Sequence, residues 1–340
     1  MVWAYSRHLE SNLQQEDTVK RIFGAALLLF FSVVISSSAH AEGYVISVNQ
    51  FVEHPALDAV LQGMKDYMRD NSVAVDFKVH NAQANMGTAN QIAQQMIGEK
   101  ADLLVAIATP SAQATAQALK RAPEDLQRPL VFTAITDPVA AGLVEDLQRP
   151  GGDITGVSDL LPVRKHLEMV LEYLPGIERL GVMYNAGEAN SKATVETIRE
   201  LSDDMGFTLV EATAAKTADV YQAAKSLLGR VDAVFIPTDN TIVSALESVL
   251  KVGVQNRLPI FAADINSVER GAAAAMGFDY YRHGYQTGAM AEKILKGASP
   301  ATLAVEFQEE LQLHINTLYS RKMGVEPPPA LLERAAKVYN

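Results

Sequence analysis

Residues 103–121 read LLVAIATPSAQATAQALKR, an apolar run followed by a polar turn and an amphipathic stretch. An uncharged run such as Leu103–Ala108 is typical of a strand buried on both faces of a parallel sheet. Ala112–Arg121 is predicted to be a helix. Thr109 is a good helix N-cap, and Pro110 suits the first helical position. The stretch therefore predicts a strand–turn–helix unit of a doubly wound α/β sheet.

The same alternation extends over both sides of this unit. Other short Val-, Ile- and Leu-rich runs predict strands, and the amphipathic stretches between them predict helices. In the first half, the other expected strands are Tyr44–Val48, Val73–Val79 and Leu130–Ala134, and the other expected helices are Ala56–Asn71 and Met86–Gly98.

The pattern restarts in the second half with the runs Leu180–Tyr184, Thr208–Ala212, Ala233–Ile236 and Ile260–Ala263. Matching residues recur at constant offsets in the same structural order, which favours two similar lobes. An offset of 129 pairs Val105 with Val234, Thr109 with Thr238, Phe132 with Phe261 and Gly142 with Gly271, and an offset of 136 pairs Asn49 with Asn185.

Polar and turn-forming residues follow the predicted strands. Ligands of open parallel sheets sit beyond the carboxyl ends of the strands. Two lobes whose polar strand ends face each other would enclose a binding cleft. The strand-end segments are 49–51, 109–111, 136–138, 185–191, 238–240 and 264–266.

The N-terminus has the pattern of a secretory signal peptide. Lys20-Arg21 precede the apolar run Ile22–Ile35, and Ala39-His40-Ala41 supplies small residues at positions −3 and −1. The run is shorter than the ~20 residues of a membrane span. We expect residues 1–41, whose polar start is over-long, to be removed after Ala41. With no Cys in the chain, no lipid anchor and no disulfide are expected.

Composition argues against several functions. The net charge of −11 and the lack of a Lys/Arg cluster argue against a nucleic-acid partner. No dinucleotide fingerprint, P-loop, H-E-x-x-H or G-x-S-x-G motif is present. The seven His residues lack metal-ligand spacing, and a soft metal site is not expected without Cys. We therefore expect a binding protein with no cofactor and no metal, and not an enzyme.

Six short segments occur in a characteristic order along the chain: 51–58 (FVEHPALD), 108–112 (ATPSA), 136–142 (TDPVAAG), 156–158 (GVS), 184–191 (YNAGEANS) and 277–281 (GFDYY). Together they resemble the substrate-binding proteins of ABC transporters, in the family that includes putative tryptophan- and phenylalanine-binding members. The resemblance covers Gly43–Asn340 and implies a type I periplasmic binding protein, with two doubly wound parallel-sheet lobes joined by three crossover strands.

The resemblance places the crossings near Gly156–Ser158, Gly277–Asp279 and Phe307–Glu309. Lobe 1 is then 42–156 plus 279–306, and lobe 2 is 157–278 plus 307–340. Glycines at two of these crossings suit a hinge.

The candidate ligand-binding residues lie at the strand ends. Thr109 and Ser111, at a helix N-terminus, suit a ligand carboxylate, or else only cap the helix. Asp239, also before a helix, is expected to hold a ligand ammonium, with Glu188 as a second candidate; each has a plain structural alternative as a helix cap or a solvated turn residue. Further polar candidates are Asn185, Asn190, Ser191, Asp137 and Asp264, and aromatic candidates for the wall are Phe51, Tyr184, Phe235, Tyr280 and Tyr281.

These features predict a monomeric periplasmic receptor that closes around a small polar ligand and passes it to an ABC permease in the inner membrane. An amino acid, aromatic ones included, is the favoured ligand, because the expected carboxylate site and the expected ammonium site oppose each other. A sugar or nucleoside receptor of the same fold is the alternative. A regulator's effector domain and an α/β hydrolase are the remaining interpretations. The one Trp, Trp3, lies in the segment expected to be removed.

Overall fold

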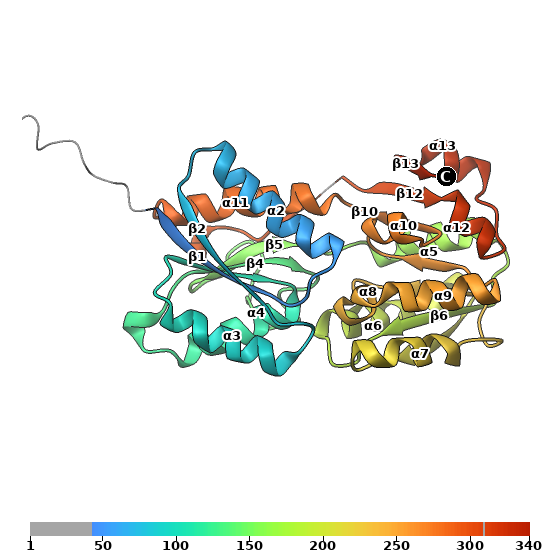
Figure 1. The fold of residues 1–340 in the computed structure, drawn as a ribbon, viewed down its shortest axis with the longest axis horizontal. Helices are drawn as coiled ribbons and strands as arrows, with labels where there is room; N and C mark the ends of the chain where they lie inside the picture. The colour runs from blue at the N-terminus through green and yellow to red at the C-terminus, as the bar shows by residue number, and fades with distance from the viewer. Residues whose placement is uncertain (1–42, 309) are drawn as a thin grey trace, which may run out of the picture. The chain divides into compact units, whose positions relative to one another are not determined.

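The computed structural model describes residues 43–308 and 310–340, and the predicted signal peptide lies outside this part of the chain. The described strands form two sheets, of six and seven strands, with helices on both faces of each (Figure 1). The predicted two-lobed α/β fold is confirmed. Within the described ranges, no helix combines the length and apolar character that a membrane span requires.

The first sheet has the order β11-β5-β4-β3-β1-β2, and all its neighbouring strands are parallel. Helices α2 and α11 cover one face, and α3 and α4 cover the other (Figure 1). We call this sheet and its helices the first lobe. Its strands are β1 (Tyr44–Gln50), β2 (Val75–Asn81), β3 (Leu103–Ile107), β4 (Leu130–Ile135), β5 (Ile154–Ser158) and β11 (Glu306–Phe307), and its helices are α2 (Pro55–Asp70), α3 (Met86–Gly98), α4 (Thr109–Arg121) and α11 (Tyr280–Leu295).

The second sheet, the core of the second lobe, has the order β13-β12-β10-β9-β8-β6-β7. Its strands are β6 (Arg179–Tyr184), β7 (Thr208–Thr213), β8 (Ala233–Ile236), β9 (Ile260–Ala262), β10 (Ala274–Gly277), β12 (Gln312–Asn316) and β13 (Lys337–Tyr339). The remaining helices are α5 (Val163–Tyr173), α6 (Ala189–Met205), α7 (Val220–Ser226), α8 (Asn240–Ser244), α9 (Leu246–Asn256), α10 (Asn266–Arg270), α12 (Thr317–Lys322) and α13 (Pro329–Arg334). Short 3₁₀ turns span Glu124–Leu126, Thr217–Asp219 and Pro300–Thr302.

The internal repeat appears directly in the strand order. The first sheet contains β4-β3-β1-β2, and the second contains β9-β8-β6-β7 in the same arrangement. The paired residues Phe132 and Phe261 lie in the corresponding strands β4 and β9, and both are fully buried. The two similar lobes predicted from the offset matches are therefore present.

One strand pair departs from the predicted parallel arrangement. β12 pairs antiparallel with β10. β10 carries the chain toward the first lobe, where α11 follows, and β12 brings the chain back from β11. The two strands therefore run in opposite directions. No helix of the second lobe connects them, as a parallel pair would require, and so they pair antiparallel.

The chain passes between the sheets after β5, after β10 and after β11. Glycine at the first of these places has a packing reason. A Cβ on Gly156 would lie 2.0 Å from the carbonyl oxygen of Phe132 in the neighbouring strand. Because its φ is not in the left-handed region, Gly156 allows this close approach and does not serve a special turn.

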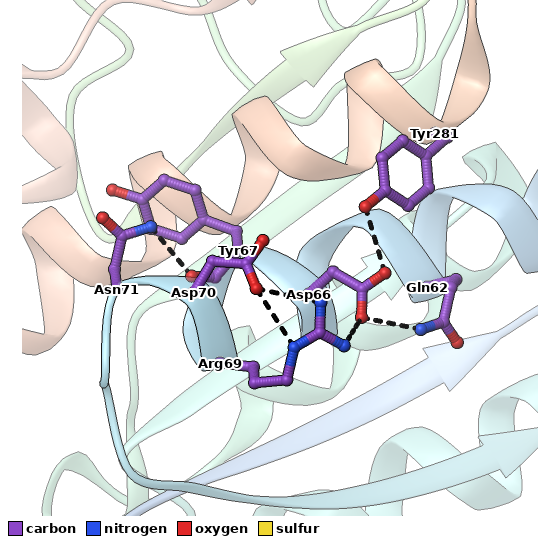
Figure 2. A network of polar contacts seen from close by, with 7 residues as sticks. All are labelled: Gln62, Asp66, Tyr67, Arg69, Asp70, Asn71 and Tyr281. Atoms are coloured by element: carbon purple, nitrogen blue, oxygen red, sulfur yellow. Dashed lines mark hydrogen bonds and ion pairs between the residues drawn. The ribbon is translucent and has the colours of Figure 1, made fainter.

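Helices α2 and α11 are in close contact although they lie far apart in the sequence. A Cβ on Gly63 would lie 2.1 Å from the carbonyl oxygen of Tyr281, and one on Gly284 would lie 1.9 Å from that of Val60. A polar network seals one side of the contact: the Tyr281 hydroxyl donates to Asp66 Oδ2 at 3.0 Å (Figure 2). The helix that follows the second crossing is therefore packed firmly onto the first lobe.

Candidate functional site

A cavity lies where the strand ends of the two lobes meet. Its volume is about 20 Å³, little more than the space of one water molecule. From the first lobe and the crossings it is lined by His54, Ala56, Leu57, Ala134, Thr136, Asp159 and Tyr280, and from the second lobe by Asn190, Thr238, Asp239, Asn240, Val243 and Asp264. We call it the central cavity.

A larger hollow of about 580 Å³ lies elsewhere, on the first lobe alone. Its walls come from α3, α4 and the segments around Gly142 and Asp153. It contains none of the predicted binding residues and receives nothing from the second lobe. The central cavity is therefore the better candidate, because it lies at the carboxyl ends of the strands where ligands of such sheets bind.

Asp159 is the best-placed acidic group of the central cavity. It directly follows β5 and is 4% exposed. Its Oδ1 accepts a hydrogen bond from the Thr136 hydroxyl and its Oδ2 accepts one from the Tyr280 hydroxyl, both at 3.0 Å. Burial raises the pKa of Asp159 to about 6. Since neither donor is charged, a cation in the cavity would stabilise the carboxylate.

The electrostatics of the whole cavity favour a cation. Asp239 and Asp264 also line it, and no Lys or Arg does. Burial raises the pKa of both carboxyl groups, and for Asp239 the neighbouring Glu188 raises the pKa further. Burial, followed by the positive charge of Arg270, lowers the pKa of His54 to about 3, so this histidine is neutral at pH 7.

Asn190 lines the same cavity and carries an unused acceptor. Its Nδ2 donates to the carbonyl oxygen of Thr238 at 2.7 Å, which fixes the amide. Its Oδ1 is buried and has no hydrogen-bond partner, although the residue is only 3% exposed. An unpaired buried acceptor costs free energy, and a ligand donor would remove that cost.

Five of the predicted residues come together at the N-terminus of α8. Glu188 accepts hydrogen bonds from the backbone N–H groups of Asn240 and Thr241 and from both of their side chains. Asp239 is the N-cap of α8 and accepts from the Ile242 N–H at 2.7 Å. Its other oxygen accepts from the Ser191 hydroxyl at 2.7 Å and the Asn185 N–H at 2.6 Å. Of these five residues, Asn185, Glu188, Asn190, Ser191 and Asp239, only Asn190 and Asp239 line the central cavity.

This cluster changes the interpretation of Asp239. Both of its carboxylate oxygens are already engaged by donors of the second lobe. The cap interpretation weighed from the sequence is thus present. Asp239 accepts three hydrogen bonds, whereas Asp159 accepts only one at each oxygen, so Asp159 retains more acceptor capacity for a ligand ammonium.

The hydroxyl groups of Thr109 and Ser111 differ in their hydrogen bonding. Ser111 donates to Asn49 Oδ1 at 2.9 Å inside the first lobe. Thr109 is 2% exposed, and its hydroxyl has no hydrogen-bond partner. The structure places Thr109 at the first position of α4 and makes Ala108 the N-cap, so the helix begins one residue earlier than the sequence predicted. Neither Thr109 nor Ser111 lines the central cavity.

Two alanines at the ends of neighbouring strands have left-handed backbone conformations. The φ angles are 78° at Ala108, after β3, and 55° at Ala134, in β4. The Ala134 N–H donates to His283 Nε2 of α11 at 3.1 Å, at a register shift between β4 and β5. Such strain persists where the surroundings enforce it, and it clusters at ligand sites.

Other predicted residues lie away from the central cavity. The Tyr184 hydroxyl donates to Glu211 at 2.7 Å, on the side of β7, and Phe51 is buried without lining the cavity. Asp137 accepts from the backbone N–H groups of Val139 and Ala140. Within the described residues, no cluster of acidic or His side chains has the geometry of a metal site.

Asp137 lines a second cavity, of about 70 Å³, which also has lining residues from both lobes. It shares Thr136 and Thr238 with the central cavity. The hydroxyl oxygens of these two threonines are 3.1 Å apart, in a hydrogen bond that crosses from one lobe to the other. We call this space the side cavity. The two cavities are adjoining parts of one interlobe cleft.

Comparison with known proteins identifies the family. The family of ABC transporter substrate binding proteins matches residues 45–339. The chain belongs to this family. It is thus a solute-binding protein of an ABC transporter, in a class of proteins that bind small molecules.

Several relatives of this binding protein are informative. A tyrosine-binding protein of Clostridioides difficile (strain R20291) is 39% identical over 277 residues, which cover 80% of this chain and 78% of the relative. The solved ABC domain in complex with L-Trp from Streptococcus pneumonia is 32% identical with a TM-score of 0.81, covering 86% of this chain and 99% of that one. A ligand-free, open substrate-binding protein with adhesive properties from Clostridium difficile is 37% identical with a TM-score of 0.63, covering 87% and 99%.

Sequence reasoning missed Asp159 and His54 as cavity residues of this binding protein. Asp159 directly follows the segment Gly156–Ser158, which is expected from the sequence to cross between the lobes. An acidic residue at the end of a crossing strand was therefore the available signal. His54 precedes α2 as its N-cap and carried no such signal beyond its place after a strand end.

Proposed function

We propose that this protein is an extracytoplasmic receptor that binds an aromatic amino acid as a zwitterion and delivers it to a membrane permease. The observation that carries the proposal is the central cavity, which three buried aspartates line and no Lys or Arg does. Such a site favours a ligand that brings a positive charge. A neutral sugar would leave this charge uncompensated. The tyrosine-binding relative and the L-Trp complex support an aromatic side chain.

In this proposal the ligand ammonium lies against Asp159. The Asp159 carboxylate supplies the charge, and Asn190 Oδ1 from the opposite lobe supplies a neutral acceptor that has no protein partner. An ammonium has three N–H donors and so can engage both residues. Contacts from both lobes would favour closure of the cleft around the ligand.

The ligand carboxylate is assigned to the N-terminus of α4. The Thr109 hydroxyl is buried without a partner, and the first-turn N–H groups of a helix attract anions. In the parallel register, Leu104 to Ile107 lie beside Leu130 to Thr133, so Thr109 falls next to the end of β4 that reaches the cavity. Ser111 supports the site from behind through Asn49.

Ligand entry requires the lobes to separate. A central cavity of about 20 Å³ does not admit an amino acid. The structure also superposes better on the L-Trp complex than on the ligand-free open protein, although it is more identical to the latter. Both observations support a closed conformation that alternates with an open one, as in hinge-type closure.

The cellular part of the proposal rests on the sequence and the family. We infer export by the signal peptide, cleavage after Ala41, and a free monomer that docks on its permease. Mass spectrometry of the periplasmic protein is expected to give an N-terminus at Glu42 without lipid. An uncleaved, membrane-bound product would contradict this part alone.

Titration calorimetry tests the ligand class. We expect tyrosine, tryptophan or phenylalanine to bind and to raise the unfolding temperature, whereas glucose, inositol and adenosine do not. The methyl ester of the bound amino acid lacks the carboxylate charge, and its N-acetyl derivative lacks the ammonium; both are expected to bind much more weakly. Tight binding of a neutral sugar or nucleoside would overturn the proposal.

A further inference from the structure

The side cavity differs chemically from the central cavity. Apolar side chains dominate one wall, where Leu160, Leu161 and Val163 follow the first crossing, and Ala193 lies on α6. The central cavity also has apolar lining residues, but it adds three buried aspartates and two asparagines to them. The cleft therefore has a polar compartment and a more apolar one, and they meet at Thr136 and Thr238.

His166 lines this more apolar compartment and carries one unused polar atom. The residue lies on α5, lines the side cavity and is 2% exposed. Its Nε2 is buried and has no hydrogen-bond partner. A buried polar atom without a partner is rare in native structures and calls for an explanation.

The protonation of His166 follows from its surroundings. Burial lowers its pKa to about 4, so the ring is neutral at pH 7. The ring also hydrogen-bonds to the backbone of Met276, and Phe235 packs 5.7 Å from it, centroid to centroid. Since Nε2 has no partner, the Met276 carbonyl accepts from Nδ1–H, which leaves Nε2 as the acceptor of the neutral ring.

We propose that His166 is a specificity-determining residue of the cleft, whose Nε2 accepts a hydrogen bond from the phenol hydroxyl of tyrosine or the indole N–H of tryptophan. This inference rests on the proposed aromatic zwitterion. The ammonium lies in the central cavity, the ring enters the side cavity, and the Thr136–Thr238 hydrogen bond opens to join the two compartments. Phenylalanine fits the same walls but offers no donor to Nε2.

The expected effect is a preference among aromatic ligands. Leaving a buried acceptor unpaired has a cost that corresponds to roughly ten- to hundredfold in affinity. The wild-type protein is therefore expected to bind tyrosine at least about tenfold more tightly than phenylalanine. O-methyltyrosine retains the oxygen without the donor, and we expect it to bind no better than phenylalanine.

Two substitutions at His166 test the assignment by titration calorimetry with tyrosine and phenylalanine. His166→Leu removes the acceptor, so the ratio of the two affinities is expected to fall to about one, mainly through weaker binding of tyrosine. His166→Gln keeps an acceptor and is expected to retain part of the preference. Retained phenylalanine binding shows that a variant is folded, and the O-methyltyrosine comparison in wild type needs no variant at all.

The outcomes separate this inference from the proposed function. If wild type binds aromatic amino acids and His166→Leu leaves the tyrosine-to-phenylalanine ratio unchanged, the role of His166 is wrong and the receptor function stands. Equal wild-type affinities for tyrosine, phenylalanine and O-methyltyrosine would likewise overturn the role of His166 alone. If wild type binds no aromatic amino acid, both the receptor proposal and the role of His166 fail.

Discussion

The Tyr280 hydroxyl donates a hydrogen bond of 3.0 Å to Asp159 Oδ2, although 121 positions separate the two residues. Asp159 follows the strand before the first crossing, and Tyr280 begins the helix after the second. The other oxygen of Asp159 accepts from Thr136, which bonds across the cleft to Thr238. The group proposed to hold the ligand ammonium is thus joined to two crossings and, through one more hydrogen bond, to the opposite lobe.

Replacing Asp159 is expected to abolish tight binding. Asp159→Asn keeps the shape of the side chain and removes its charge. Breaking a buried charge pair costs roughly 3–5 kcal/mol, which corresponds to about two to three and a half orders of magnitude in affinity. Calorimetry with the cognate amino acid measures the loss. Affinity within about threefold of wild type would rule out Asp159 as the ammonium site.

Asp239 provides the matched control in the same cavity. Asp239→Ala removes the side chain that caps α8 and its bonds to Ser191 and the Asn185 N–H. Loss of a cap costs about 0.5–2 kcal/mol, so we expect a lower free energy of unfolding in denaturant. Its effect on ligand affinity is expected to be far smaller than that of Asp159→Asn. If the substitution of Asp239 weakens binding more than Asp159→Asn does, Asp239 and not Asp159 is the ammonium site.

Affinity is expected to depend on pH through Asp159. Its pKa is about 6 in the ligand-free protein, and only the ionised form attracts an ammonium. Affinity should therefore be nearly constant above pH 7 and fall by up to about tenfold per pH unit below pH 6. Calorimetry from pH 5 to 8 measures the dependence. Asp159→Asn, with no group to titrate there, is expected to bind weakly with a flatter profile.

The free energy of unfolding of the ligand-free protein is expected to rise as the pH falls, whereas the ligand affinity falls. The pKa of Asp159 is raised from 3.8 to about 6 by folding, so its favourable contribution is present below about pH 4 and is lost as the pH rises through 6. Protonation of Asp159 contributes at most about 3 kcal/mol to the free energy of unfolding. Denaturant unfolding at pH 5 and pH 7 should show wild type gaining more on acidification than Asp159→Asn. An equal gain in the free energy of unfolding in both proteins would show that a group other than Asp159 titrates in this range.

The hydrogen bond between Thr136 and Thr238 is expected to bias the lobes toward closure. Thr238→Val removes it with little change in shape, and one hydrogen bond contributes about 0.5–1.5 kcal/mol. The ratio of closed to open molecules should fall severalfold, and small-angle scattering of the ligand-free protein should give a larger radius of gyration. Thr302→Val, at an exposed residue, is the control. A Thr238→Val profile identical to wild type would contradict the role of this contact.

The α2–α11 contact is expected to tolerate no added methyl group. Gly284→Ala would place Cβ 1.9 Å from the Val60 carbonyl oxygen, and the backbones must then move apart. We expect a loss of about 1–3 kcal/mol or more in the free energy of unfolding. Gly98→Ala, at the end of α3 where nothing lies within 4 Å, should be neutral or stabilise by up to about 1 kcal/mol. Equal stabilities of the two variants would show that α11 can shift freely on α2.

Most of the fold could be predicted because it depends on local patterns. The apolar runs of the first half lie within two residues of the observed strands, and Met86–Gly98 matches α3 at both ends. The antiparallel β12 could not be predicted in this way. Its direction depends on which lobe the chain comes from, and periodicity carries no information about that.

The site was less predictable, because strand ends identify a region and not the direction of each side chain. Tyr184 ends β6 as expected, yet its hydroxyl contacts Glu211 on the side of β7. Asp239 and Glu188 were both expected at the cleft, but backbone N–H groups at the N-terminus of α8 already donate to their oxygens. Asp159 gains its importance from Tyr280 and Thr136, both distant in sequence, and no local motif encodes that meeting.

The packing of α11 on α2 also affects the order in which the chain can fold. Pro55–Asp70 leaves the ribosome early, but its partner Tyr280–Leu295 is made near the end of synthesis. The first lobe therefore cannot complete its core until most of the second lobe has been translated. Contacts between distant segments slow folding. The export proposed above would benefit from this delay, because the N-terminal lobe would stay incomplete while the predicted signal peptide engages the export machinery.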